Sequence, residues 1–405
     1  MDQLSIQLIV PFGVRGITRS QCHASYSVSD RAKSAFRAHL SGDINTASTL
    51  YDEEIACKSN NPQIYSNRAA IWYANNEYSL ALRLLERAHS LQEAPSYTSY
   101  LVSHCSLLTS NYGKAWRFYE YRWLNNYIPD INIQLPACDP APLSSVDKRK
   151  YIVHQDGGLG DLVFILNLFL ESDLLDNIIY VGDPRSCSLL SALKPNITTI
   201  SHLTYLQTTK SGMYEGWIPI QSLMRIGESP LVNGLAKQQT RHIRFTSRPC
   251  KIGLHWQGNS LNELYLIPGS RSVPLTLFID LLLDDSLSLY SLQLGQAAQQ
   301  TNIFKPLFDY LAHIDQNVIS SNAAYIELVK SMDMIVCVDS FVANLAGYLR
   351  KPTLLILSCH HDWRWVARDA EGFSTLYPTV KILEWRNQIT SEELHDSFRT
   401  FLSSY

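Results

Sequence analysis

The sequence predicts a multidomain protein in which N-terminal α-helical repeats precede two doubly wound parallel sheets of the α/β class. Two patterns predict this fold: a 34-residue recurrence between about residues 30 and 125, and an alternation of short apolar runs with amphipathic stretches from about residue 150 onward. The length agrees, because 405 residues are enough for two or three domains that each have their own core.

The composition is that of an ordinary globular protein, with 46% hydrophobic and 18% charged residues. A formal net charge of -3 gives no general attraction to nucleic acid or anionic lipid, so we expect neither as a partner. No apolar run approaches the roughly 20 residues that span a bilayer. The acidic, proline-interrupted start, MDQLSIQLIVPFGV, does not have the pattern of an export signal. We therefore expect a cytoplasmic protein without a membrane span.

The eight cysteines are scattered without a Cys-x-x-Cys pair, which predicts reduced thiols and neither a zinc module nor a disulfide framework. The neighbouring residues Cys359, His360 and His361 lack a second ligand pair at a suitable spacing. No metal site is therefore predicted.

Ala47, Ala81 and Ala115 recur every 34 residues, and large apolar positions recur in step with them. In each copy a polar turn precedes an amphipathic helix, and the alanine permits close approach of two helices. The period and pattern resemble tetratricopeptide repeats, whose helix pairs stack into a superhelix. We expect these repeats over residues 28–125, after an unassigned segment at residues 1–27.

Such repeats either buttress the rest of the chain or hold a peptide or partner protein on their concave face. The candidate residues for that face are Tyr65, Asn67, Arg68, Tyr97 and Tyr100. Aromatic residues at helical spacing are, however, more often part of a core.

Residues 126–149 carry four prolines and no helical period, which predicts a linker. Beyond it, runs such as YIVHQ, NIIYVG, KIGLHW and MIVCVD alternate with helical patterns. This alternation is typical of parallel sheets with helices on both faces. We expect one Rossmann-like half at residues 150–247 and a second at 248–405. Ligands should then bind between the halves, at the carboxyl ends of the strands.

The first strand-to-helix junction, GGLGD, combines Gly157, Gly158 and Gly160 with Asp161. The glycines allow a tight turn, but the spacing fits neither a dinucleotide loop nor a P-loop. A carboxylate at a helix N-terminus would repel a phosphate bound there. Asp161 is therefore either a helix cap or a base for an acceptor hydroxyl.

Two junctions of the second half offer groups for an anion. Asn259 and Arg271, on the loop after KIGLHW, would present a neutral donor and a forked cation to a diphosphate, unless this loop is simply solvated. Asp339 and Ser340 follow the buried run MIVCV at a helix N-terminus, where backbone amides suit an anion. Asp339 itself is a cap, a ribose contact or a catalyst.

Three tryptophans, Trp256, Trp363 and Trp365, lie near these junctions. They either stack on a nucleobase or sugar or wedge the two halves together. For Trp363 and Trp365 we favour packing.

The ordered series of motifs resembles bacterial proteins that join tetratricopeptide repeats to a glycosyltransferase domain similar to the lipopolysaccharide heptosyltransferases, which have the GT-B fold. The motifs that carry this resemblance are FYEYRW (118–123), GGLGD (157–161), IPIQSL (218–223), IGLHWQGN (252–259), RSVPL (271–275), YSLQLG (290–295), VDSFVANLAGYLRKP (338–352), DWRW (362–365) and YPT (377–379).

The resemblance implies an inverting transfer from a nucleoside-diphosphate sugar, without a structural need for a metal or another cofactor. It makes residues 150–247 the acceptor side and 248–405 the donor side. Asp161 corresponds to the family's base for the acceptor hydroxyl. Ser340 and the following amides would hold the diphosphate, with Asn259 and Arg271 as further candidates. Asp339 and Asn344 are the remaining candidates for binding the donor.

The chain departs from the family pattern at several positions. Ser340 replaces the usual threonine, Asn344 replaces a histidine, and Gly157 stands where a glutamine is usual. The segment AEGFSTLYPT lacks the family's Ser-Pro-Trp. Two alternatives therefore stand beside a glycosyltransferase acting on a protein or peptide acceptor: a noncatalytic adaptor with a degraded transferase fold, and a sugar or nucleotide sensor.

Overall fold

The computed structural model describes residues 28–91, 97–125, 148–170, 173–208, 213–225, 250–258, 271–303, 311–312, 321–358, 361–385 and 389–403. They form two compact units, one with the described residues up to 125 and one with those from 148 onward. No helix of the described chain combines the length and the apolar character needed to cross a bilayer.

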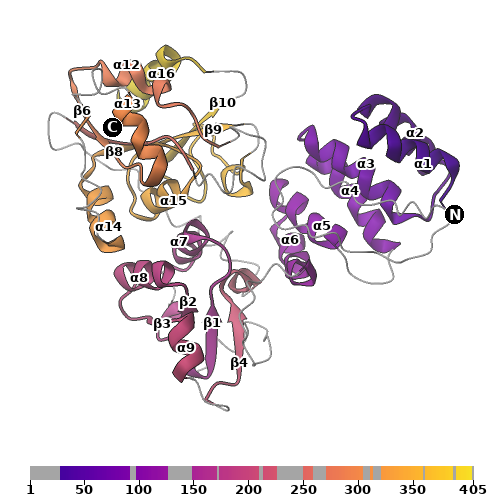
Figure 1. Ribbon diagram of the computed structural model, residues 1–405, viewed down its shortest axis with the longest axis horizontal. Helices are drawn as coiled ribbons and strands as arrows, with labels where there is room; N and C mark the ends of the chain where they lie inside the picture. The colour runs from indigo at the N-terminus through magenta and orange to yellow at the C-terminus, as the bar shows by residue number, and fades with distance from the viewer. Residues whose placement is uncertain are drawn as a thin grey trace. The chain divides into compact units, whose positions relative to one another are not determined.

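The first unit is built from consecutive helix pairs, as Figure 1 shows, and each helix contacts the next along the chain. The helices are α1 (Asp30–Leu40), α2 (Ile44–Ala56), α3 (Pro62–Ala74), α4 (Tyr78–Ser90), α5 (Tyr97–Leu108) and α6 (Tyr112–Tyr119), followed by the 3-10 helix η1 (Glu120–Asn125). The second helices of successive pairs begin 34 residues apart, at Ile44, Tyr78 and Tyr112. The recurrence in the sequence is therefore the length of one helix pair.

The recurring alanines mark the buried side of these pairs. Ala47, Ala81 and Ala115 each have 0% exposure. A larger side chain at these positions would push the helices apart, which explains why a small residue recurs there. Polar side chains begin several of the helices: Ser29, Asp43 and Asn61 accept hydrogen bonds from first-turn N–H groups of α1, α2 and α3.

The residues expected on an open concave face are buried instead. Tyr65, Asn67, Arg68 and Tyr100 are all at most 8% exposed, and the side chain of Tyr97 lies outside the described residues. Arg68 forms a bidentate ion pair with Asp52 at 2.8 and 3.0 Å, which joins α3 to α2. Of the two alternatives for these four residues, packing within the helical unit is therefore the one that the structure supports.

The second unit contains two parallel sheets. The first has the order β3-β2-β1-β4, and all its neighbouring strands run parallel. Its elements are η3 (Lys148–Lys150), β1 (Tyr151–His154), α7 (Leu159–Leu168), η4 (Asp173–Leu175), β2 (Ile179–Gly182), α8 (Pro184–Leu193), β3 (Thr198–Ser201), α9 (His202–Thr208), β4 (Gly216–Pro219) and η5 (Ile220–Arg225).

The second sheet has the order β10-β9-β8-β5-β6-β7, again entirely parallel. Its elements are β5 (Cys250–His255), η6 (Leu275–Phe278), α12 (Ile279–Leu282), β6 (Leu287–Ser291), η7 (Gly295–Gln299), α13 (Gln300–Ile303), β7 (Leu311–Ala312), α14 (Asn322–Ser331), β8 (Met334–Val338), α15 (Phe341–Tyr348), β9 (Thr353–Ser358), η8 (Trp363–Trp365), β10 (Val380–Trp385) and α16 (Ser391–Ser403).

Both sheets are doubly wound, which confirms the predicted α/β architecture. The chain moves outward from β1 and returns to pair β4 on its other side, and it does the same from β5 to β8. Each sheet therefore has a switch point, between β1 and β4 and between β5 and β8. Ligands of such sheets bind outside the carboxyl ends of the strands at these points.

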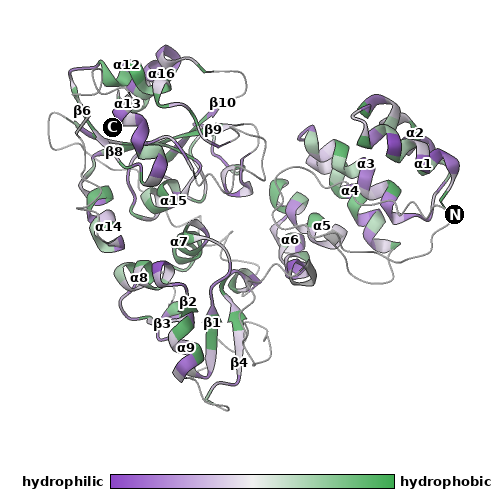
Figure 2. Cartoon of the chain, viewed as in Figure 1, coloured by the Kyte–Doolittle hydropathy of each residue, from purple (hydrophilic) through white to green (hydrophobic). Residues whose placement is uncertain are grey.

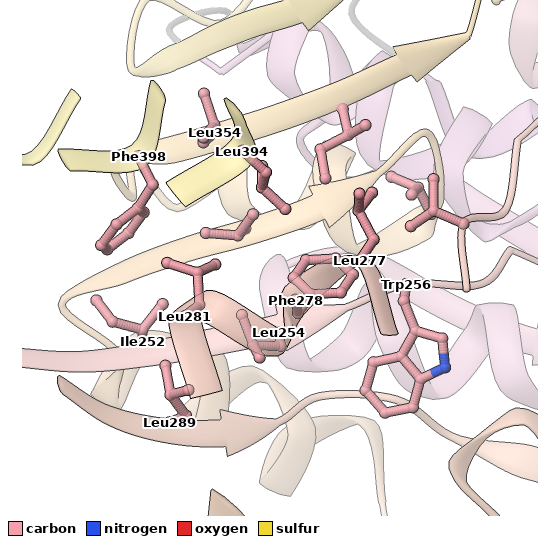
Figure 3. Close-up of a cluster of buried hydrophobic side chains, with 14 of the residues drawn as sticks. Ile252, Leu254, Trp256, Leu277, Phe278, Leu281, Leu289, Leu354, Leu394 and Phe398 are labelled. Carbon is pink, nitrogen blue, oxygen red and sulfur yellow. The ribbon is translucent and has the colours of Figure 1, made fainter. Parts of the chain in front are cut away.

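The core of the second sheet is made by residues from β5, β6, β8 and β9 and by the helical segments η6, α12 and α16. Figure 3 labels members of this core from β5, β6, β9, η6, α12 and α16. Trp256 belongs to this cluster and has 0% exposure. Figure 2 shows that green, apolar residues also dominate α7 of the first half.

A buried histidine ends the central strand of each sheet. His154 has no exposed surface, and its Nε2 lies 3.1 Å from Nε2 of His202, whose ring stacks on it. His255 is 7% exposed and lies beside Ser340. Burial lowers the pKa of both side chains from the ordinary 6.5 to about 4, with His202 lowering that of His154 further. Both imidazoles are therefore neutral at pH 7.

We predict that the second unit loses stability as the pH falls from about 6.5 to about 4. In this window the unfolded chain binds protons at both histidines and the folded chain does not, so each contributes a slope of about 1.4 kcal/mol per pH unit to the free energy of unfolding. Urea unfolding at several pH values measures the slope. His154→Gln should reduce this slope by about 1.4 kcal/mol per pH unit, the contribution of one proton. Equal slopes for the variant and the wild type would contradict the low pKa assigned to His154.

Candidate functional site

The three glycines that precede Asp161 have different structural roles. Gly157 has φ +96°, and a Cβ there would lie 2.6 Å from Asp161 Oδ2 and 2.7 Å from Gln221 Nε2. Gly160 lets α7 approach α15, since an added Cβ would lie 3.3 Å from Asn344 Nδ2. Gly158 has an ordinary φ of -89° and serves as the N-cap of α7.

Asp161 is the third residue of α7, which begins at Leu159 after the N-cap Gly158. Its Oδ2 accepts a hydrogen bond of 2.7 Å from the backbone N–H of Gly158. Its Oδ1 accepts one from Nη2 of Arg364, which belongs to the second half of the unit. Asp161 therefore both stabilises the helix N-terminus, as in the cap interpretation, and forms an ion pair between the two sheets.

One face of α7 makes further contacts with the second half. The ring of Phe164 meets Trp363 edge-on, with centroids 5.4 Å apart. Asn167 Nδ2 donates a hydrogen bond of 3.1 Å to the carbonyl oxygen of Leu376. Asp161, Phe164 and Asn167 follow one another at intervals of three residues, so they share one side of the helix. α7 consequently fixes the carboxyl edge of the first sheet against the second half.

Arg364 is held in place on several sides. Its side chain is 10% exposed, and its Nη1 donates a hydrogen bond of 3.3 Å to Asp362 Oδ2. Its guanidinium carbon lies 4.8 Å from the ring centroid of Phe164 and 5.5 Å from that of Trp363. Aromatic faces attract a guanidinium, so these rings support it without occupying its N–H donors.

A second ion pair lies at the end of β8. Nε of Arg271 is 3.8 Å from Oδ2 of Asp339. Asp339 raises the pKa of Arg271 most, and Asp362 and Asp161 raise it further, whereas burial and Arg364 lower it. These five residues, Asp161, Arg271, Asp339, Asp362 and Arg364, interact electrostatically, and we call them the charge cluster.

The turn at Ser340 lies next to Asp161. Gly160 precedes Asp161 directly, and an added Cβ there would lie 3.7 Å from Cα of Phe341, the residue after Ser340. Ser340 is the N-cap of α15 but makes no side-chain cap hydrogen bond; its hydroxyl lies 3.3 Å from Nδ1 of His255 instead. The two turns that the sequence singled out, at 157–161 and 339–340, are thus brought together.

Two of the predicted donor contacts are occupied by internal bonds. Asn344 is 3% exposed; its Nδ2 donates to the carbonyl oxygen of Ser340 at 3.0 Å and its Oδ1 accepts from the Tyr377 hydroxyl at 3.1 Å. Asp339 is 6% exposed and accepts a hydrogen bond of 2.9 Å from Trp365 Nε1. Both residues stabilise the fold around the site, and neither presents a free polar group to a donor.

The three tryptophans are all buried, so none offers an open face for stacking on a ligand. Trp256 and Trp365 have 0% exposure and Trp363 has 5%. Trp256 lies in the sheet core, Trp365 contacts Tyr377, and Trp363 contacts Phe164 of α7. The packing interpretation therefore describes these residues better than the stacking one. Asn259 lies outside the described residues, and Cys359 and His360 do as well.

Sequence reasoning overlooked three residues inside the motifs it quoted: Arg364 in DWRW, His255 in IGLHWQGN and Gln293 in YSLQLG. Gln293 Oε1 accepts hydrogen bonds from the backbone N–H groups of Trp256 and Gln257 at 3.1 and 2.9 Å, which fixes the loop after β5. The sequence pattern Trp-Arg-Trp could have identified Arg364, because an arginine that packs against aromatic rings is partly buried and needs an acidic partner.

The arrangement combines a partly exposed carboxylate, a hydroxyl beside a helix N-terminus and two guanidinium groups. Carboxylates accept protons, and backbone amides and guanidinium groups bind phosphate oxygens. Within the described residues, no cluster of three or more His, Cys, Asp or Glu side chains is arranged to hold a metal ion.

Comparison with known proteins found neither a matching family model nor a matching curated protein. Among solved structures, E. coli ADP-heptose lipopolysaccharide heptosyltransferase II is 11% identical, with a TM-score of 0.43 over 63% of this chain and 99% of that one. E. coli heptosyltransferase WaaC with ADP is 8% identical, with a TM-score of 0.41 over 62% and 98%. A mutant O-GlcNAc transferase of Thermobaculum terrenum is 13% identical, with a TM-score of 0.30 over 93% and 91%.

The glycine loop gives a matched pair of substitutions. Gly157→Ala places a side chain at positive φ against Asp161 and Gln221, so we predict a loss of stability of about 1–3 kcal/mol. Gly158→Ala has an ordinary φ, and its Cβ would lie 3.6 Å from Asp161 Oδ2, a normal contact. We expect it to change stability by less than about 0.5 kcal/mol. Thermal unfolding of both variants checks this; equal losses would contradict the assigned role of Gly157.

Proposed function

We propose that the chain is a metal-independent, inverting glycosyltransferase that moves a sugar from a nucleoside-diphosphate sugar to an acceptor hydroxyl. One observation carries the proposal: Gly160 of the first half lies against the Ser340 turn of the second, and the carboxylate of the next residue, Asp161, pairs with Arg364 of that second half. The motif resemblance described above agrees with it.

In this proposal Asp161 is the general base. The acceptor oxygen forms a bond to the anomeric carbon while the bond from that carbon to the diphosphate oxygen breaks. The electron pair leaves with the diphosphate, and the acceptor proton passes to Asp161. Attack from the face opposite the leaving group inverts the anomeric centre.

The diphosphate would bind at the N-terminus of α15. Ser340 makes no side-chain cap hydrogen bond there, which favours amide contacts to an anion. Arg271 is the nearby described cation on the loop that leads to η6, and Asn259 remains a candidate from the sequence. Preorganised donors of this kind stabilise the charge that develops on the leaving group by several kcal/mol.

The helical unit is proposed to consist of tetratricopeptide repeats that recruit a protein or peptide acceptor. The 34-residue spacing of the helix pairs supports the repeat class. The burial of Tyr65, Arg68 and Tyr100 means that any binding surface uses other residues.

The internal bonds of Asn344 and Asp339 favour a second candidate function, a noncatalytic adaptor that has kept the transferase fold. Such a protein would bind its partner through the helical unit without turning over a sugar donor. Binding and turnover must therefore be measured separately.

We predict that one of a panel of nucleotide sugars raises the melting temperature and is slowly hydrolysed or transferred. A donor at 100 times its Kd stabilises the folded state by about 2.7 kcal/mol. Asp161→Ala should keep at least this stabilisation and lose turnover by about 10²–10⁴-fold, because it removes the base. Asp176→Ala, which removes a first-half carboxylate that contacts Asn196, is the matched control.

Two results would decide against this function. Undiminished turnover in Asp161→Ala would exclude Asp161 as the base. Binding without turnover across the whole panel, in the presence of candidate acceptors, would favour a sensor or an adaptor.

A further inference from the structure

We propose that Arg364 is a positioning residue that holds Asp161 inactive in the ligand-free protein and that an anionic substrate releases Asp161 by drawing Arg364 away. The inference rests on the proposed function, because it concerns how the same carboxylate becomes available. It concerns a residue to which neither the motif pattern nor the proposed mechanism assigned a role.

Both oxygens of Asp161 accept hydrogen bonds within the protein. Oδ2 accepts from the N–H of Gly158 at 2.7 Å, and Oδ1 accepts from Nη2 of Arg364. The two side chains of this pair are 23% and 10% exposed, so the pair is partly shielded from water. An acceptor hydroxyl that donates to this carboxylate has to compete with the N–H groups of Gly158 and Arg364, which already occupy both oxygens. A base role therefore requires that Arg364 move or find another partner.

The surroundings of Arg364 allow an exchange of partners without loss of its position. Asp362 Oδ2 remains a second acceptor at 3.3 Å. The rings of Phe164 and Trp363 support the planar group from the side. Because a guanidinium has five N–H donors in a fixed plane, a small rotation can transfer one or two of them to a phosphate.

The net charge of the charge cluster favours a transfer of Arg364 from Asp161 to a bound diphosphate. The charge cluster holds three carboxylates and two guanidinium groups, so it is formally short of one positive charge. A diphosphate that binds at the Ser340 turn adds further negative charge close to Asp161. Arg364 is the cluster member that already bridges the two halves, so it is the cation that can turn toward the phosphate. Its departure frees Oδ1 of Asp161 when the donor arrives, which couples donor binding to activation of the base.

The coupling predicts that removing the charge of Asp161 strengthens anion binding. In Asp161→Asn the amide oxygen can still accept from Gly158, but Arg364 loses its competing carboxylate. We expect the Kd of ADP, UDP or inorganic pyrophosphate to fall about five- to tenfold, which corresponds to about 1.0–1.4 kcal/mol. Arg364→Gln should weaken binding, and Asp161→Asn should give no gain in the Arg364→Gln background.

Isothermal titration calorimetry on the full chain measures these Kd values for the wild type, both single variants and the double variant. Asp183→Asn is the matched control, because it removes one carboxylate at the N-terminus of α8 in the same half. It reports the general effect of one negative charge and should change the Kd less than twofold. If Arg364→Gln does not fold, Arg364→Lys replaces it, and Asp161→Asn by itself still tests the proposal.

The outcomes separate the two proposals. A Kd in Asp161→Asn equal to that of the wild type or of Asp183→Asn overturns the role of Arg364 and leaves the nucleotide-sugar donor standing. A gain that persists without Arg364 overturns it as well. If neither the wild type nor Asp161→Asn binds any of the three anions, both proposals fail.

Discussion

The packing of α7 between two sheets is the constraint on which the second unit depends. Leu162, Val163 and Leu166 are at most 3% exposed, while Phe164 and Asn167 make contacts with the second half. A helix buried in this way needs a different partner on each side, and its glycine-rich start must be narrow where it meets α15. The conformation of the glycine loop, the ion pair of Asp161 and the approach of the two switch points all follow from this packing.

The polar residues at this junction serve both the fold and the candidate chemistry. Charged groups removed from water need close partners, and the ion pair Asp161–Arg364 satisfies this requirement. Arg271 Nε and Asp339 Oδ2 face each other at 3.8 Å, which is too far for a hydrogen bond. The same pairs occupy groups that a transferase would use. A substrate that binds at this junction, as proposed above, would have to compete with these stabilising contacts.

Two buried, neutral histidines lie at the switch points of the two sheets. His154 and His255 end the central strands of the two sheets, and burial keeps both uncharged at pH 7. His255 contacts the hydroxyl of Ser340, so the side chain nearest to the proposed anion site adds no charge of its own. Charge at that site is consequently set by the two arginines and three carboxylates of the charge cluster.

The sequence by itself determined the helix-pair period, the buried alanines, the two doubly wound sheets and the loops that end their central strands, because hydrophobic periodicity and glycine placement are local properties of the chain. The short strands β3 and β4 escaped prediction, since β3 (TTIS) is polar and partly exposed and β4 (GWIP) contains a glycine and a proline, which are typical of loops. Only the tertiary structure decided that Trp256 and Trp365 are core residues, that Asn344 bonds to Tyr377, and that Arg364 reaches Asp161. These partners lie 33 to 203 residues apart in the sequence, and their pairing depends on how the two sheets meet, which no local pattern encodes.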